Sequence, residues 1–525
     1  MDAATRLRTE RQRVVADTRL GGAAFGAALS DVCDAVLVDT ATDLALKGRW
    51  AVIAQGSYAR RELCPGSDLD IALIHAGGAR GRSAEAAART LWYPFWDAGC
   101  TLGQATRTPK ESLHLADGDL DALTALLDIR VVAGDRAFAL DLQDKARALA
   151  AQRRSRVVGA LAAAANARYE RPGAVAEMLE PNVKEGAGGL RDLHALAWAG
   201  WAVSAHGGLA GLVDAGVLAP DDVAELEVAN ARILDVRVAL HRVTGGRSDQ
   251  LTLQEQDAVA RLLGMDDADA MLRSLADAAR TVGWLSREVW SRTESATTGP
   301  RGRIAARDVP LAPGVVLRDT RVALLADEPL TLTATLRVAA AAAERGAAID
   351  RATLARLGDV DGDVSWGVED RDAFFRLLRS GRALVPVFES LDHVGALVRL
   401  LPEWAHVRAR PQRNAYHRFT VDRHLLEAVV EGDALLDGTG VESDVARRCR
   451  PELLLFGILT HDIAKGAPGD HSEVGAGRAA DFAARIGLEA HAVDVVAWMV
   501  RNHLAMADTA TRRDLADPAT ILRFG

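Results

Sequence analysis

The chain has 525 residues, 49% of them hydrophobic and 26% charged, with a formal net charge of -9; this length indicates several domains. The acidic balance argues against a general nucleic-acid-binding protein, which needs a basic surface. No stretch reaches the ~18–20 consecutive apolar residues of a membrane span, and no signal-peptide pattern opens the chain, so we expect a cytoplasmic protein that binds neither nucleic acid nor membrane.

The first predicted elements are one or two amphipathic helices over 11–47. Two short apolar runs follow at 50–55 and 68–75, each bounded by turn residues, which favours strands. A further strand is expected near 103–107, and helical periodicity dominates the rest of 84–150. The N-terminal part should therefore hold a small sheet packed with helices.

The remaining sequence predicts mostly helices. Alanine- and leucine-rich runs cover 150–295, interrupted by a glycine-rich segment at 184–192. A linker-like stretch and a small strand pair are expected over 294–330, and helices resume near 331. Eight of the thirteen histidines lie at or after His393. We therefore expect a mainly α protein with few strands and a histidine-rich C-terminal part.

The stretch from Gly56 to Asp70 carries the first candidate site. Side chains alternate along a strand, so Asp68 and Asp70 point the same way. Two adjacent carboxylates repel each other unless a divalent cation lies between them, and Mg²⁺ suits such a site because it also takes phosphate oxygens. Gly56 and Ser57 follow the preceding strand directly, where backbone N–H groups can hold a terminal phosphate. The predicted chemistry is in-line attack on an α-phosphate. A lone pair of solvated aspartates is the alternative, and the Gly-Ser turn argues against it.

The glycine-rich segment has two interpretations. Lys184 and Arg191 flank its glycines, so the backbone could approach a nucleotide while the two cations neutralise its phosphates. The alternative is a hinge between helices with solvated flanking charges. The residues alone do not separate the two. With Arg60, these two cations complete our set of predicted nucleotide-binding residues, together with Gly56 and Ser57.

A second candidate site is the adjacent pair His461-Asp462, at the end of an apolar helix. A buried imidazole and carboxylate need partners, and a metal satisfies both. Mixed nitrogen and oxygen ligands suit manganese, iron or zinc and hold magnesium more weakly. The predicted chemistry is hydrolysis of a phosphoester by water whose pKa the metal lowers. Further predicted ligands occur at intervals around this pair: His424, His471, His503 and Asp514.

Other residues of the same types compete for these roles. Asp508 and Asp517 lie close to Asp514, so the last ligand stays open among the three. A single helical histidine is usually a structural residue, and we assign four others to that class: His393, His406, His417 and His491.

These motifs resemble two known superfamilies. The sequence GSYARRELCPGSDLD resembles the nucleotidyltransferase superfamily, in which a Gly-Ser turn precedes Asp-x-Asp. More narrowly, it looks like the transferase domain of the bifunctional PII uridylyltransferase/uridylyl-removing family. A third acidic ligand is common in the superfamily; Asp128 is a candidate, and the third ligand stays open. The ordered set H…HD…H…H…D resembles the HD superfamily of metal-dependent phosphohydrolases, in its fuller form, which can hold two metals.

The resemblance covers nearly the whole chain and implies its organisation. It implies a mainly α, multidomain protein with a small α/β nucleotidyltransferase domain and an all-helical HD domain at the C-terminus. The domain boundaries we expect are a polymerase-β-like nucleotidyltransferase domain over 1–145, a helical transferase-associated domain over 146–295, a connecting region over 296–375 and a truncated HD domain over 376–525.

The resemblance also implies the function. The transferase would move UMP from UTP to a tyrosine of the PII nitrogen-regulatory protein, with Mg²⁺ at Asp68 and Asp70. The HD site, with catalytic His461 and Asp462, would remove it using Mg²⁺, Mn²⁺, Fe or Zn. The alternatives are an ATP-dependent PII adenylyltransferase, a stand-alone HD phosphohydrolase and a nucleotide-sensing regulator without turnover. The family continues into two glutamine-binding ACT domains, whereas this sequence stops at ILRFG, so we expect little or no response to glutamine.

Overall fold

The computed structural model describes residues 2–42, 44, 46, 48–77, 81–298, 308–361, 365–412, 418–514 and 516–524. The chain divides into two compact units, Met1–Gly299 and Pro300–Gly525. The protein is mainly helical with a small mixed sheet, as predicted. None of the helices in the described ranges is both long and apolar enough to cross a membrane.

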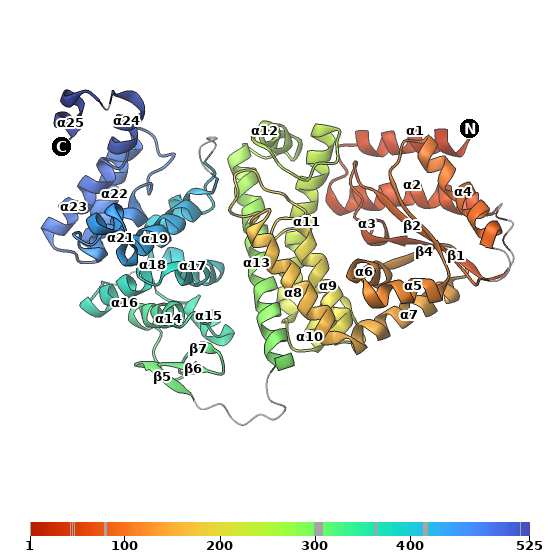
Figure 1. The fold of residues 1–525 in the computed structure, drawn as a ribbon, viewed down its shortest axis with the longest axis horizontal. Coiled ribbons are helices and arrows are strands. Elements are labelled where there is room, and N and C mark those ends of the chain that lie inside the picture. Colours follow the sequence, from red (N-terminus) through yellow and green to blue (C-terminus); the bar gives the residue numbers. More distant parts are fainter. Residues whose placement is uncertain are drawn as a thin grey trace. The chain divides into compact units, whose positions relative to one another are not determined.

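A four-stranded mixed sheet organises the first half of unit 1 (Figure 1). Its order is β3-β2-β1-β4, with β2 and β3 parallel and the other pairs antiparallel. Helices α2 and α4 lie on one face of the sheet, and α5, α6 and α7 lie on the other. The strands are β1 (Trp50–Gln55), β2 (Leu69–His75), β3 (Leu102–Arg107) and β4 (Ile129–Gly134).

Three of these strands agree with the sequence prediction, and β4 was missed. Alternate side chains of β1 and β2 form a core with α2 and α4 on one side of the sheet: Val52, Ala54, Leu69, Ile71 and Leu73. The helices of this half are α1 (Ala3–Ala16), α2 (Gly22–Thr42), α3 (Gly56–Ala59), α4 (Gly81–Asp97), α5 (Pro109–Gly118), α6 (Leu120–Leu127) and α7 (Arg136–Gln152).

The second half of unit 1 is helical around the glycine-rich segment, as expected. Helix α11 packs against both α2 and α13, so it joins the helical half to the sheet half. Its helices are α8 (Arg154–Glu170), α9 (Leu190–Val203), α10 (Gly208–Asp214), α11 (Pro220–Thr244), α12 (Leu253–Leu262) and α13 (Ala268–Thr298).

Most of the expected linker lies outside the described residues. The described part of unit 2 begins with a three-stranded antiparallel sheet rather than the expected strand pair: β5 (Val309–Ala312), β6 (Val315–Arg318) and β7 (Arg321–Leu324). The helices next along the chain are α14 (Leu332–Arg345), α15 (Arg351–Leu357), α16 (Val368–Leu378), η1 (Gly381–Ala383), α17 (Leu384–His393), α18 (Ala396–Leu400) and η2 (Pro402–His406). The C-terminal part is helical, as predicted: α19 (Val421–Asp437), α20 (Val441–Ala446), α21 (Pro451–Thr460), α22 (His471–Arg485), α23 (Ala490–Arg501), α24 (Ala505–Arg512) and α25 (Pro518–Phe524).

Candidate functional sites

The Gly-Ser turn and the paired aspartates lie at the same end of the sheet in unit 1. Gln55, the last residue of β1, pairs with Asp70 on β2, so the turn that follows β1 lies beside Asp70. Gly56 has φ +54°, a conformation that favours glycine. A Cβ built on Gly56 would lie 3.1 Å from the Asp70 Oδ2 atom. The turn therefore needs glycine both for its backbone conformation and for its contact with the carboxylate.

Gly103 bounds the same carboxylate from the other side. It pairs with Asp70 in the parallel β2–β3 ladder, and a Cβ at this position would lie 2.0 Å from Asp70 Oδ1. Sequence reasoning placed a strand here but missed this role, because the contact depends on the strand register.

Gly103→Ala is expected to displace the Asp70 carboxylate. For the nucleotidyl transfer that the sequence predicts, we expect a loss of rate of about 100-fold, as a shift of about 1 Å in a catalytic group can cause. Initial rates of transfer measure this effect. Gly159→Ala on α8 is the matched control, because a Cβ there meets nothing within 4 Å. Equal rates for the Gly103 variant and the control would show that the position of Asp70 does not matter for transfer.

The electrostatics of the aspartate pair favour a bound cation. Burial, and after it the Asp68 carboxylate, raises the pKa of Asp70, although Lys184, Arg60 and Arg191 act in the opposite direction. Asp70 is half-buried, whereas the Asp68 side chain is 54% exposed. A divalent cation between the two carboxylates would relieve both the burial cost and the repulsion, so the residues present fit Mg²⁺.

A cleft of about 690 Å³ opens at this end of the sheet. Both halves of unit 1 line it, and the predicted residues that do so are Gly56, Ser57, Arg60, Asp68, Asp70, Lys184 and Arg191. The cleft thus places the Asp68 and Asp70 carboxylates near several basic side chains, among them Lys184 and Arg191, a combination that suits a nucleoside triphosphate and its metal.

The glycine-rich segment serves mainly to pack backbone against backbone. Gly188 has φ +77°, and a Cβ there would lie 2.3 Å from the Ala279 carbonyl oxygen on α13. The Arg191 guanidinium donates to Glu185 at 2.8 Å. The structure therefore places the glycines against a helix and the flanking cations at the cleft, which combines features of both sequence interpretations.

Arg60 lies in the cleft wall with its guanidinium held by protein groups. It donates to Glu62 at 2.8 Å and to Asp128 at 2.7 Å, and lies 3.4 Å from His194 Nδ1. Burial, followed by the Arg60 charge, lowers the pKa of His194 to about 4, so this imidazole is neutral and its Nε2–H donates to Glu62 at 3.0 Å. This network joins the turn after β1 to α9 and was not predicted from the sequence. Its members are up to 134 residues apart along the chain.

Asp128, the candidate third carboxylate, directly precedes β4. Ile129 pairs with Gln55, which also pairs with Asp70, so Asp128 lies at the same end of the sheet as the aspartate pair. Its Oδ2 atom accepts hydrogen bonds from Arg60 and from the Trp198 indole, each at 2.7 Å. Asp128 is therefore well placed by its strand and held by two donors, and its role as a metal ligand stays a prediction.

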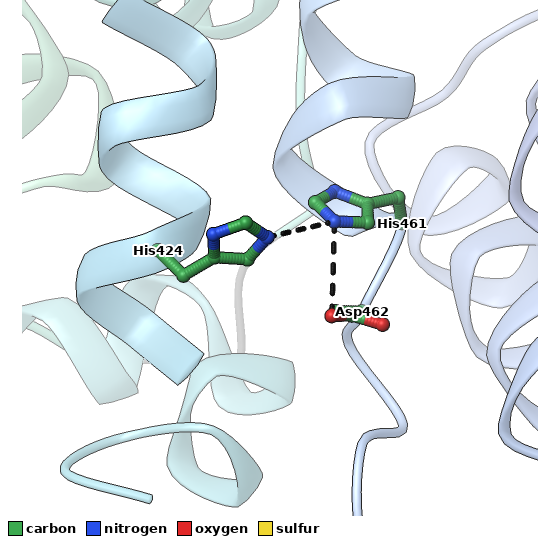
Figure 2. Close-up of side chains that lie close together, drawn as sticks. All are labelled: His424, His461 and Asp462. Carbon is green, nitrogen blue, oxygen red and sulfur yellow. Dashed lines mark hydrogen bonds and ion pairs between the residues drawn. The ribbon is translucent and has the colours of Figure 1, made fainter. Parts of the chain in front are cut away.

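In unit 2 the predicted histidines converge on the buried carboxylate of Asp462. Figure 2 shows His424 on α19 facing His461 at the end of α21, with Asp462 below them. The His424 and His461 Nε2 atoms are 3.2 Å apart, and His461 Nε2 lies 3.7 Å from Asp462 Oδ2. On the other carboxylate oxygen, Oδ1, the Nε2 atoms of His471 and His503 lie at 3.7 and 3.5 Å.

The unpaired atoms of this cluster fit a metal. Asp462 Oδ1 and the Nε2 atoms of His471 and His503 are buried without a hydrogen-bond partner, which is costly in a protein interior. His461 and His503 each donate Nδ1–H to a backbone carbonyl, at 2.8 and 2.7 Å, which leaves Nε2 as the lone-pair atom. Burial lowers the pKa of His461 despite the nearby Asp462 carboxylate, which favours the neutral ligand form.

The cluster forms two overlapping groups that share Asp462. His424, His461 and Asp462 form one, and Asp462, His471 and His503 form the other. Lys465 also reaches Asp462 Oδ2, at 3.0 Å. Sequence reasoning missed this lysine, which lies three residues after Asp462 in the turn that follows α21.

The remaining predicted residues lie elsewhere. Asp514 is exposed and accepts a hydrogen bond from the Ala516 N–H at 2.9 Å, and neither metal-type group among the described residues contains it. His406 contacts the Lys465 carbonyl oxygen through Nε2 at 3.1 Å. His393 ends α17, His491 is exposed on α23, and His417 lies outside the described residues.

A mainly apolar groove of about 1500 Å³ adjoins the cluster. His424, His461 and His503 lie along it, together with Trp498, whose side chain is 63% exposed. The groove can therefore accept a bulky organic group next to the candidate metal ligands.

Comparison with known protein families defines the class of this chain. Residues 156–290 match the family GlnD PII-uridylyltransferase, and residues 421–523 match the HD domain. The chain therefore combines a nucleotidyltransferase-type unit with an HD-type domain, and an HD domain implies a divalent metal.

Individual relatives have names that agree with these two family matches. The chain is 41% identical to the bifunctional uridylyltransferase/uridylyl-removing enzyme of Streptomyces coelicolor over 489 residues, which cover 90% of this chain and 56% of the relative. It is 37% identical to the protein of the same name from Mycobacterium tuberculosis over 510 residues, 94% of this chain and 60% of the relative. The chain spans little more than half the length of these curated relatives. The predicted resemblance to this bifunctional family is thereby confirmed.

Proposed function

We propose that this chain attaches a nucleoside monophosphate to a PII signalling protein at the cleft of unit 1 and removes it at the histidine cluster of unit 2. One observation carries the proposal: a single chain holds a carboxylate pair in a cationic cleft and a separate imidazole–carboxylate cluster. The first set suits transfer from a nucleoside triphosphate, and the second suits hydrolysis of a phosphodiester. The names of the relatives support the same pair of reactions.

In the proposed transfer, Asp68 and Asp70 hold Mg²⁺, which supplies charge neutralisation to the reacting phosphates when bound. Gly56 and Ser57 hold a terminal phosphate, while Lys184 and Arg191 neutralise the triphosphate from the other half of unit 1. The acceptor is a tyrosine hydroxyl of the PII protein, which attacks the α-phosphate as pyrophosphate leaves. The Arg60 guanidinium, which donates to Glu62 and Asp128, stabilises the side of the cleft and is not a free cation for the triphosphate.

In the proposed removal, the ligands are His424, His461, Asp462, His471 and His503. Asp462 offers one oxygen to each of the two overlapping groups, so these residues would hold one or two divalent metals. Mg²⁺ or Mn²⁺ is our first choice for the metals, with iron or zinc as alternatives. A divalent metal there activates the attacking water when bound. The adjoining groove would receive the nucleoside.

Intact-mass analysis of a PII protein tests the proposal. The protein is incubated with Mg²⁺, either UTP or ATP, and the Asp462→Asn form of this chain, which should not remove the nucleotide again. We expect a UMP adduct; an AMP adduct would assign the ATP-dependent alternative instead. No adduct with either nucleotide would refute the transferase assignment and leave the HD phosphohydrolase as the function of the chain.

A further inference from the structure

The end of α11 and the segment after it hold the turn that leads into Asp68. His241, at the end of α11, accepts a hydrogen bond from the Gly66 N–H through Nδ1 at 3.2 Å. Its Nε2–H then donates to Asp249 at 2.9 Å, and Arg237 donates to the same carboxylate at 2.7 Å. Because His241 is buried, this chain of bonds holds the turn two residues before Asp68 in one position.

The two backbones also meet directly. A Cβ on Gly66 would lie 2.3 Å from the Gly246 carbonyl oxygen and 3.0 Å from the Arg247 Cα atom. Such close packing needs glycine at position 66. The backbone of Arg247 is therefore held beside the Asp68 turn by its own packing, independently of any ion pair.

The side chain of Arg247 is far less constrained than its backbone. Its Nη1 atom lies 3.2 Å from Asp68 Oδ1, and the two side chains are 58% and 54% exposed. An exposed ion pair of this kind contributes little free energy. A divalent cation that binds Asp68 can therefore displace the guanidinium at small cost, and the fixed backbone keeps the guanidinium within reach of whatever that cation binds.

We propose that Arg247 exchanges the Asp68 carboxylate for the triphosphate of the nucleotide when the metal site fills. This inference rests on the proposed transferase function and adds a phosphate-binding residue to it. An arginine suits the role because its planar guanidinium donates two parallel hydrogen bonds to phosphate oxygens. The proposal therefore predicts two opposite effects of one side chain: Arg247 weakens metal binding at Asp68 and strengthens binding of the nucleotide.

Calorimetric titrations on the full chain test both effects. Every chain titrated also carries Asp462→Asn, which removes metal binding at the HD cluster. In Arg247→Gln, we expect Mn²⁺ alone to bind about 2- to 5-fold more tightly, because the metal no longer has to displace an exposed ion pair from Asp68. In the presence of Mn²⁺, UTP or ATP, whichever the parent chain binds, should bind about 10-fold more weakly. Arg247→Lys, which keeps the charge, should lie between the two chains.

Arg261→Gln, on the exposed side of α12, is the matched control and should change neither titration. Unchanged nucleotide binding in Arg247→Gln, or weaker Mn²⁺ binding, would overturn the role of Arg247 while leaving the transferase proposal intact. A parent chain that binds neither UTP nor ATP with Mn²⁺ would overturn both.

Discussion

Replacing Asp68 and Asp70 with asparagine should abolish nucleotidyl transfer, with a loss of about 1,000-fold or more, while hydrolysis of a nucleotidylated PII protein continues. Neutral amides cannot hold the divalent cation that offsets the charge of the reacting phosphates, and lost charge stabilisation of this kind has effects of that order. The two carboxylates lie in unit 1 and the histidine cluster lies in unit 2, so the hydrolytic residues are untouched. Intact-mass assays of the two reactions measure the loss of transfer and the retained hydrolysis.

Asp39→Asn is the control for this first prediction. Asp39 is 61% exposed and pairs with Arg6, much as Asp68 pairs with Arg247, but it lies on α2 away from the residues that line the cleft. Both reactions should be unchanged in this variant. Transfer at the wild-type rate by the double asparagine chain would contradict the assignment of Asp68 and Asp70 as metal ligands.

The second large effect concerns Asp462→Asn. This carboxylate is shared by both metal-type groups, and an amide removes its charge from both and replaces one of its two ligand oxygens with an NH₂ group that cannot bind a metal. We expect the metal content of unit 2 to fall and hydrolysis of the nucleotidylated partner to drop at least about 100-fold, with transfer retained. Elemental analysis of the purified chain and an intact-mass assay measure the two effects.

Asp481→Asn offers a matched control, because this aspartate lies exposed on α22 in the same domain. It should keep both metal and hydrolysis. Hydrolysis that survives in Asp462→Asn with its metal lost would show that the reaction does not depend on this cluster.

The two sites could be predicted from the sequence because each depends on local spacing. Asp68 and Asp70 share a face for any strand at this position, and the pair His461-Asp462 marks the end of an apolar helix. The parts that were missed depend on contacts between distant segments. The contact of Gly103 with the Asp70 carboxylate, for example, follows from the register of β2 and β3.

Strand β4 escaped prediction for a physical reason. Its short run IRVVAG begins two residues after α6 ends, in a part of the chain where helical periodicity dominates, so nothing local separates it from the neighbouring helices. The role of Arg60 was similarly hidden. Its position in the motif predicted a phosphate ligand, whereas Asp128 and His194, 68 and 134 residues away, hold its guanidinium.

The central claim is that one chain carries both reactions in separate sites, and a two-step mass measurement tests it most directly. A PII protein is first incubated with the Asp462→Asn chain, Mg²⁺ and the nucleotide. It is then freed of nucleotide and incubated with the Asp68→Asn, Asp70→Asn chain and a divalent metal. We predict a gain of one nucleoside monophosphate per PII subunit in the first step and its complete loss in the second. No gain in the first step, or an adduct that persists through the second, would contradict the account.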